Sequence, residues 1–217
     1  RHLVATSDWQ REYRRRSQPF ALGGRWWVDP GEPDGRPLDP PMGRRPLRIP
    51  ARTAFGTGSH SSTSLIVELM EDMRLAGSRI LDVGTGSGIL TILALMSGAE
   101  SVTAFDTDPG ATCIARQTSR LNRVEPRLFA GSIAALRSGG RRAAFDVILA
   151  NVLPANLEAD LAEVVTHLAA DGSLLISGLL IEQGDRAEAR LRALGLRRAA
   201  YRSASEWLAL HLKAEAS

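Results

Sequence analysis

From about residue 61 onward, short apolar runs of strand length alternate with longer amphipathic segments. The apolar runs predict strands over Arg79–Val83, Ser101–Phe105, Arg127–Ala130, Phe145–Ala150, Ser173–Ser177, Arg197–Arg202 and Trp207–Lys213. The amphipathic segments predict helices over Ser62–Met73, Ile89–Ser97, Gly110–Asn122, Ile133–Arg137, Ala155–Ala169 and Ile181–Leu194. Strands that alternate with helices form a parallel sheet with helices on both faces.

The last two predicted strands break this alternation, because too few residues separate them for a crossover helix. They should therefore pair antiparallel. We predict an α/β, Rossmann-like fold whose seven-stranded, mostly parallel sheet includes an antiparallel C-terminal strand. This plan resembles that of class I methyltransferases.

Residues 1–53 have a different pattern, with dense Pro and Gly and little apolar periodicity. A helix near Ser7–Arg16 and strands near Arg25–Val28 and Leu47–Ile49 are expected. Because so short a segment would struggle to bury a core of its own, we predict an arm or linker that packs on a main domain of residues 54–217.

Composition narrows the class of protein. No stretch reaches the roughly 18 to 20 apolar residues of a membrane span, and the N-terminus lacks the apolar core of a signal peptide. We expect a cytoplasmic protein without membrane contact. The one cysteine, Cys113, rules out an internal disulfide and a multi-thiolate metal site, and we expect it to be a small buried helix residue.

The net charge of +3 is modest, and Lys213 is the only lysine among many arginines. Two groups of arginines are close in sequence: Arg11, Arg14, Arg15 and Arg16, and then Arg44, Arg45, Arg48 and Arg52. Such clusters can contact RNA phosphates or an acidic protein surface, or they can form a solvated face. Direct RNA contact therefore stays open.

The clearest chemical signal is a Gly-rich loop that joins a predicted strand to a predicted helix. It begins at Asp82 and contains Gly84, Gly86 and Gly88, in the pattern D-x-G-x-G-x-G. A dinucleotide loop needs a glycine at the position of Ile89, and no Gly-Lys-Ser/Thr follows as a P-loop requires. The pattern matches the loop that binds S-adenosylmethionine (SAM), whose positive charges favour an acidic residue nearby.

Polar residues also end two other predicted strands. Asp106 follows the second strand, where a carboxylate can accept hydrogen bonds from both ribose hydroxyls. Asp108 precedes a proline and is expected to cap the next helix. Asn151 follows Phe145–Ala150 at the carboxyl edge of the sheet, where it can orient an amine or cap a turn.

Further segments resemble one family. Residues 54–63 read A-F-G-T-G-S-H-S-S-T, similar to the A-F-G-T-G-T-H-x-T-T signature of the bacterial ribosomal protein L-eleven methyltransferases, the PrmA family. The order of Ala150–Leu153, Ser177–Leu180 and Glu206–Trp207 agrees with it. The resemblance implies a transferase that methylates lysine side chains, and possibly an α-amine, of a ribosomal protein. The family's N-terminal recognition domain is absent from the printed sequence.

The resemblance also implies roles for individual residues. Thr57, Gly58 and His60 would belong to a loop that closes over SAM, with Gly84, Gly86 and Gly88 at the methionine end, Asp106 at the ribose and Asn151 at the methyl-transfer edge. Thr107 stands where family members have an aliphatic residue against adenine, and Ser61 stands where a proline is usual.

The expected reaction needs proximity and a neutral amine rather than a catalytic triad or a metal. His60 is a candidate general base, or else a hydrogen-bonded hinge residue. Two alternatives remain: a small-molecule or RNA methyltransferase, and a SAM-binding interaction protein without turnover. The oligomeric state cannot be derived from the sequence.

Overall fold

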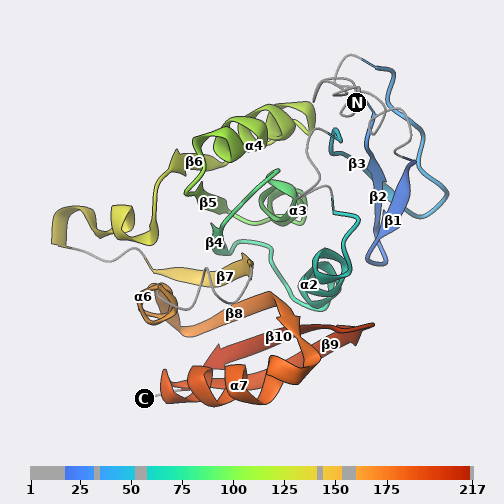
Figure 1. Ribbon diagram of the computed structural model, residues 1–217. Coiled ribbons are helices and arrows are strands. Elements are labelled where there is room, and N and C mark those ends of the chain that lie inside the picture. Colours follow the sequence, from blue (N-terminus) through green and yellow to red (C-terminus); the bar gives the residue numbers. More distant parts are fainter. Residues whose placement is uncertain (1–17, 32–34, 52–57, 141–143, 153–159, 216–217) are drawn as a thin grey trace, which may run out of the picture.

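The computed structural model of the chain describes residues 18–31, 35–51, 58–140, 144–152 and 160–215. Its centre is a sheet of seven strands: β4 (Arg79–Val83), β5 (Ser101–Asp106), β6 (Arg127–Ala130), β7 (Phe145–Asn151), β8 (Leu168–Leu180), β9 (Leu196–Ala204) and β10 (Trp207–Ala214). Their order is β6-β5-β4-β7-β8-β10-β9 (Figure 1).

The strand directions agree with the predicted plan. The neighbours from β6 to β8 pair in parallel, whereas β10 pairs antiparallel with both β8 and β9. The C-terminal strand β10 thus lies one position inside the sheet, and β9 forms the edge. The short turn between β9 and β10 permits only this antiparallel hairpin.

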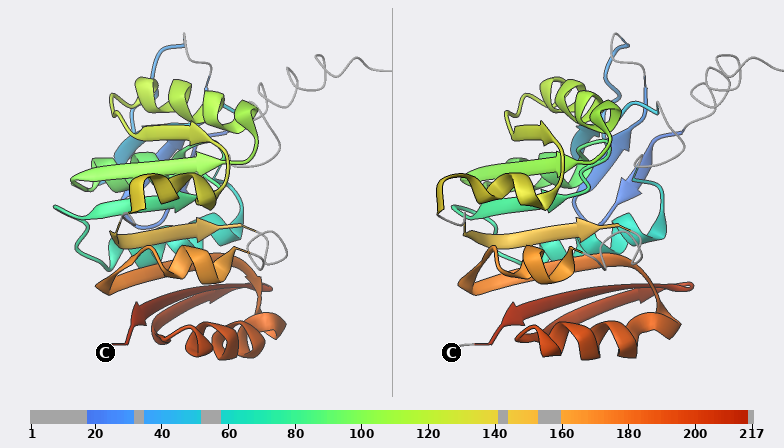
Figure 2. Two further views of the ribbon diagram at one scale, coloured as in Figure 1. Left: turned by 90° about the vertical axis from the view of Figure 1, so that its left-hand side faces the viewer. Right: turned by 60° about the vertical axis from the view of Figure 1, so that its left-hand side comes forward.

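Helices cover both faces of the sheet (Figures 1 and 2). On one side, α2 (Ser61–Glu71) and α3 (Ile89–Met96) share a core with alternate strand residues such as Ile80 and Leu149. On the other, α6 (Leu161–Val165) and α7 (Gly184–Ala193) pack on the intervening ones, such as Leu81 and Ile148. α4 (Pro109–Leu121) contacts β5, β6 and α3, and the 3₁₀ segment η1 spans Ile133–Gly140.

The predicted helices of the C-terminal half need correction. Of the expected helix Ala155–Ala169, the described part is helical only over Leu161–Val165, and Leu168 already begins β8. The Phe145 amide donates to the carbonyl of His167, and Phe145 pairs with Leu168, so sheet pairing outweighs the local helix preference. The expected helix Ile181–Leu194 divides into a 3₁₀ turn η2 (Ile181–Gln183) and α7.

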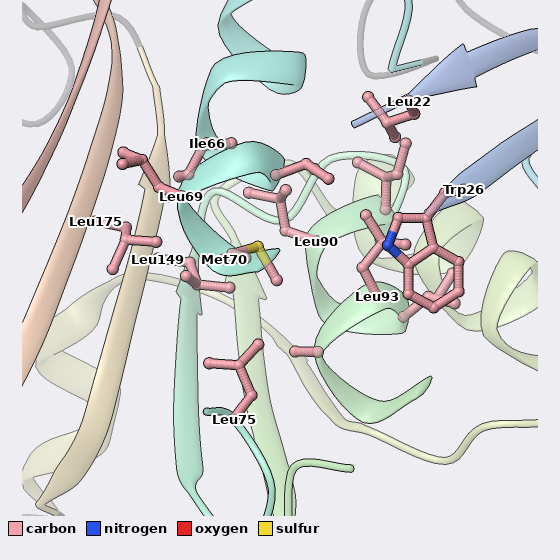
Figure 3. Packing of buried hydrophobic residues seen from close by; sticks show 14 of the residues in the cluster. Leu22, Trp26, Ile66, Leu69, Met70, Leu75, Leu90, Leu93, Leu149 and Leu175 are labelled. Atoms are coloured by element: carbon pink, nitrogen blue, oxygen red, sulfur yellow. The ribbon is translucent and has the colours of Figure 1, made fainter. Parts of the chain in front are cut away.

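A small second sheet precedes the main one: β1 (Phe20–Leu22), β2 (Trp26–Asp29) and β3 (Arg45–Arg48). β1 was not among the predicted strands. Leu22 and Trp26 are buried in the core that α2 and α3 share, and Figure 3 shows Trp26 beside Leu93 of α3. The predicted helix near Ser7–Arg16 and the predicted boundary at residue 53 lie outside the described residues.

The second arginine group, where it is described, joins this small sheet to the main one. Arg44 donates to the carbonyls of Gly23 and Trp26, and Arg45 donates to the carbonyl of Met96 at the end of α3. The Arg45 guanidinium also lies 4.6 Å from the centre of the Trp26 ring. These arginines therefore act within the molecule.

His211 of β10 gives a testable pH dependence. The half-buried ring lies 3.0 Å from the Ser173 hydroxyl, and burial, with the charge of Lys213, lowers the pKa of His211 below its usual 6.5. A folded state that disfavours the protonated ring loses stability as pH falls below about 6.5. In thermal melts between pH 8 and about 5, His211→Gln should lose less stability than the unaltered protein. If the melting temperatures of the two proteins fell equally with pH, His211 would not be the cause of the pH dependence.

Candidate functional site

A cavity of about 690 Å³ lies at the carboxyl ends of the central strands. Ligands of α/β sheets bind at this edge, and the volume suits a drug-sized or nucleoside-sized ligand. The lining comes from the Gly-rich loop, the helix N-termini and the strand ends: Gly58, Ser59, His60, Ser62, Thr63, Asp82, Gly84, Thr85, Gly86, Ser87, Ile89, Leu90, Asp108, Ala111, Ile114, Asn151, Val152, Gly178 and Trp207.

The Gly-rich loop turns sharply out of β4. Gly86 has a φ of 55°, and a Cβ on it would meet no atom within 4 Å, so this part of the backbone faces open space. Gly88 has a φ of 84° and precedes α3, and a Cβ there would lie 3.1 Å from the Ala115 side chain. Gly86 thus lets a ligand approach the backbone, whereas Gly88, which does not line the cavity, lets α3 and α4 pack closely.

Asp82 is a buried acid in the cavity wall. Its Oδ2 accepts hydrogen bonds from the hydroxyls of Thr85, at 2.7 Å, and Thr91, at 2.6 Å. Burial raises the pKa of Asp82 although both hydroxyls oppose the shift. A cationic ligand group beside this carboxylate would stabilise its ionised form. The sequence interpretation included Thr85 only as part of the Gly-rich loop and did not include Thr91, because nothing in their spacing showed that both hydroxyls would reach one carboxylate.

Asp106 and Asp108 lie beside the loop, and of these two acids only Asp108 is among the residues that line the cavity. The Asp106 carboxylate accepts from the amides of Gly86 and Asp108, each at 3.0 Å, and is half-buried. Asp108 lines the cavity and accepts from the Gly110 amide at 2.8 Å, so it is the N-cap of α4 as expected. Thr107 is exposed and does not line the cavity. Ala111 and Ile114 of α4 supply apolar surface to the cavity lining instead.

The N-terminus of α2 closes another side of the cavity. The Asn151 amide donates to the Thr63 hydroxyl at 3.1 Å, which ties the end of β7 to the first turn of α2. The buried Ser177 hydroxyl of β8 donates to the carbonyl of Ser62 at 2.8 Å. Thr63 was missed by the sequence interpretation, although it stands at the last threonine of the A-F-G-T-G-T-H-x-T-T pattern. Thr57 and the rest of residues 52–57 lie outside the described residues.

His60 is the N-cap of α2. Its Nδ1 accepts from the Ser62 amide at 3.3 Å and lies 2.8 Å from the Ser62 hydroxyl. An imidazole whose Nδ1 lone pair is engaged in this way presents Nε2–H, a donor, in its neutral form. The ring also lies edge-on to Trp207, with 4.6 Å between centroids. These contacts favour the hinge interpretation of His60 over that of a general base.

The parallel sheet with an inserted antiparallel strand, the Gly-rich loop after β4 and the acid at the end of β5 together define the class I methyltransferase fold. The sequence matches the family described as "Ribosomal protein L11 methyltransferase (PrmA)" over residues 1–215, and the chain belongs to this family. The resemblance stated from the sequence is thereby confirmed.

Individual relatives of known sequence support the same family. The chain is 36% identical over 200 residues to the ribosomal protein L11 methyltransferase of Prochlorococcus marinus (strain MIT 9303), with 89% of this chain and 65% of the relative covered. It is 32% identical to that of Trichlorobacter lovleyi, with 97% of this chain and 69% of the relative covered. The chain therefore spans about two thirds of the length of these curated relatives.

Solved structures show the same fold. The ribosomal protein L11 methylase of Lactobacillus delbrueckii subsp. bulgaricus has a TM-score of 0.79 at 26% identity, with 92% of this chain and 98% of that chain covered. The magnesium protoporphyrin IX methyltransferase of Synechocystis PCC 6803, solved with bound SAM, has a TM-score of 0.56 at 18% identity, over 69% and 76% of the two chains. The second likeness concerns the fold alone.

Proposed function

We propose that the cavity binds SAM and that the protein transfers the methyl group to lysine ε-amines, and possibly an α-amine, of a protein related to ribosomal protein L11. The observation that carries the proposal is the buried Asp82 in a wall formed by a Gly-rich loop whose Gly86 backbone is open to the cavity. A buried carboxylate beside an open loop backbone fits a ligand with a cationic amino-acid end and without phosphates. Family membership supports the protein substrate.

Each end of the cavity has a proposed role. The loop from Gly84 to Gly88 and Asp82 would hold the methionine end, and the Asp106 oxygens, each with a lone pair beyond its present hydrogen bond, would accept from the ribose hydroxyls. Leu90, Ala111 and Ile114 offer apolar surface for the adenine. Residues of α4 would then supply the apolar adenine contact that the family pattern places at the position of Thr107.

Bound SAM supplies a methyl group on a positively charged sulfur, which is already an activated leaving group. The protein then has to align the attacking amine and keep it neutral. The Asn151 amide nitrogen donates to Thr63, and within the described part of the chain no hydrogen bond occupies its Oδ1, which would accept an N–H of the attacking amine. His60 and Trp207 would shield this position from water. A ribosomal protein as substrate would put the reaction in the cytoplasm.

The test is transfer of radiolabelled methyl groups from SAM into a bacterial extract, with SAM binding measured on the same preparation. A labelled band that trypsin removes and nuclease does not would support the proposal. A nuclease-sensitive product would replace it with an RNA methyltransferase, and a labelled product that resists both treatments and is small enough to dialyse would indicate a small-molecule substrate. SAM binding without any labelled product would favour an interaction protein.

Asn151→Ala should lower methyl transfer by about 100-fold, because a misplaced amine loses alignment with the methyl group. Binding of S-adenosylhomocysteine should change far less, which isothermal titration calorimetry can check. The control is Asn122→Ala, which removes an asparagine that joins the end of α4 to the Arg48 backbone and does not line the cavity, so it shows the effect of losing a structural asparagine. Unaltered transfer by Asn151→Ala would remove this residue from the mechanism.

Among the described residues, no helix is long and apolar enough to cross a membrane.

A further inference from the structure

An exposed row of arginines runs along α4 and the neighbouring sheet edge. Arg116 and Arg120 are four residues apart on α4, Arg123 follows in the turn after the helix, and Arg127 begins β6. All four side chains are exposed. Arg116 donates to the carbonyl of Leu128, so its side chain reaches from the helix to β6. We call these four residues the α4/β6 arginine stripe.

The arginines of the stripe outnumber the acidic residues beside them in the sequence. α4 contains no acidic residue, and Glu125 is the one acid between Pro109 and Ala130. Within the described part of the chain, none of the four arginines forms an ion pair. Like charges four residues apart destabilise a helix slightly, so an unneutralised stripe costs stability unless an anion binds it.

The opposite edge of the sheet is different. There, Arg198 of β9 pairs with Glu188 of α7, and Arg202 pairs with Asp72 after α2. Both sheet edges carry arginines that discourage pairing with other strands. At the β9 edge two arginines are paired and one, Arg197, is not, whereas none of the four arginines of the stripe has an acidic partner among the described residues. Edge protection alone therefore does not account for the number of unpaired arginines in the stripe.

The surroundings favour a phosphate backbone over an acidic protein as the partner. Protein interfaces usually centre on a buried apolar or aromatic anchor. The large exposed apolar residues of the described chain are Leu38, Met42, Ile181 and Tyr201, and none lies on α4 or β6. Four residues along a helix advance about 6 Å, so the Arg120 guanidinium and the nitrogens of Arg116 that do not donate to the Leu128 carbonyl can bind successive anionic groups.

We propose that the α4/β6 arginine stripe binds the phosphate backbone of RNA. α4 begins at the cavity with Asp108 and Ala111, so RNA on the stripe would lie on the outer side of a helix that also forms the cavity wall. The stripe would hold an RNA-bound protein substrate near the cavity. RNA binding itself needs neither SAM nor the proposed methyl transfer.

The test uses the full chain and a fluorescein-labelled single-stranded RNA of about 20 nucleotides, measured by fluorescence polarisation between about 50 and 200 mM KCl. Four phosphate contacts predict a loss of affinity of roughly 50-fold over this range. The variant Arg120→Gln/Arg123→Asn/Arg127→Thr should bind at least about 10-fold more weakly and show a shallower salt dependence. Asn is chosen at 123 because that residue has a φ of 58°, which Asn tolerates.

The matched control is Arg74→Gln/Arg192→Gln/Arg197→Thr, which removes the same charge from exposed arginines elsewhere. Its affinity should fall less than about threefold. Equal losses in the two variants would mean that net charge alone attracts RNA, and would overturn the proposal, as would a failure of the unaltered protein to bind RNA. Circular dichroism and unchanged binding of S-adenosylhomocysteine establish that both variants are folded.

Cys113 supplies an independent readout. It is exposed, contrary to the sequence expectation, because α4 buries Thr112 and Ala115 instead, and it lies one turn before Arg116. It is also the one cysteine of the chain. RNA should slow its alkylation by a maleimide, whereas polyglutamate at equal charge should not. Equal protection by polyglutamate would replace RNA with an acidic protein surface.

Discussion

Asp106→Ala should weaken binding of S-adenosylhomocysteine by at least roughly 100-fold. Two hydrogen bonds from ribose hydroxyls to a carboxylate contribute about 1.5 to 3 kcal/mol each, and about 1.4 kcal/mol corresponds to a factor of ten. The variant also removes the acceptor of the Gly86 and Asp108 amides, which holds the Gly-rich loop against the end of β5. Isothermal titration calorimetry measures the loss directly.

Asp108→Ala is the matched control, since it removes an adjacent carboxylate that lines the cavity but serves as a helix cap. Loss of such a cap costs about 1 kcal/mol of stability, with little effect on the ligand if Asp106 holds the ribose. Asp106→Asn keeps one oxygen acceptor and should give an intermediate affinity. If Asp108→Ala loses more affinity than Asp106→Ala, the ribose site belongs to Asp108.

Asp82→Asn should stabilise the protein and weaken SAM binding at the same time. Because burial raises the pKa of Asp82, ionisation of this carboxyl lowers the stability of the folded state. The protonated carboxyl therefore stabilises the folded state relative to the unfolded state. This stabilisation is fully present below the unfolded pKa near 3.8 and is lost as the pH rises through the raised pKa of the folded state. Asn can still accept from the Thr85 and Thr91 hydroxyls without that cost. Its melting temperature should exceed that of the unaltered protein at pH 7.5, and the difference should vanish in acid.

The same substitution removes an anion beside a cationic ligand. Loss of one charge-assisted hydrogen bond weakens binding by roughly 10- to 100-fold. SAM, which has a sulfonium charge as well as an amine, should lose more affinity than S-adenosylhomocysteine, which has the amine alone. Thr91→Val keeps the carboxyl and removes one of the two hydroxyls that lower its pKa, so it should weaken SAM binding less than Asp82→Asn. An Asp82→Asn protein that is less stable and binds SAM normally would show that the carboxylate is structural.

Several site predictions rested on backbone geometry that the sequence encodes locally. The strand Arg79–Val83 and the glycines after it were predictable because apolar runs and left-handed loop positions have strong residue preferences. The N-cap role of Asp108 followed from Asp-Pro at a helix start in the same way. The roles proposed for Gly84, Gly86, Asp106 and Asn151 in binding and transfer remain predictions, which the experiments above test.

Other features depend on contacts between distant parts of the chain. Thr63 meets Asn151 across 88 positions, and Arg45 of the small sheet reaches the carbonyl of Met96 at the end of α3. Neither contact leaves a periodic signal, and so Thr63 was overlooked while Arg44 and Arg45 were considered for RNA. The prediction of a helix over Ala155–Ala169 was wrong at its C-terminal end because Leu168 pairs with Phe145 of β7 in the sheet.

The sequence by itself determined the alternation of strands and helices, the Gly-rich loop, and the acids near the ends of β4 and β5, because each depends on neighbouring residues. Only the tertiary structure decided which acid lies in the cavity wall, which oxygen each hydroxyl reaches and which arginines keep an acidic partner. These depend on burial and on side-chain distances of a few ångströms between segments far apart in the chain, which local patterns do not specify.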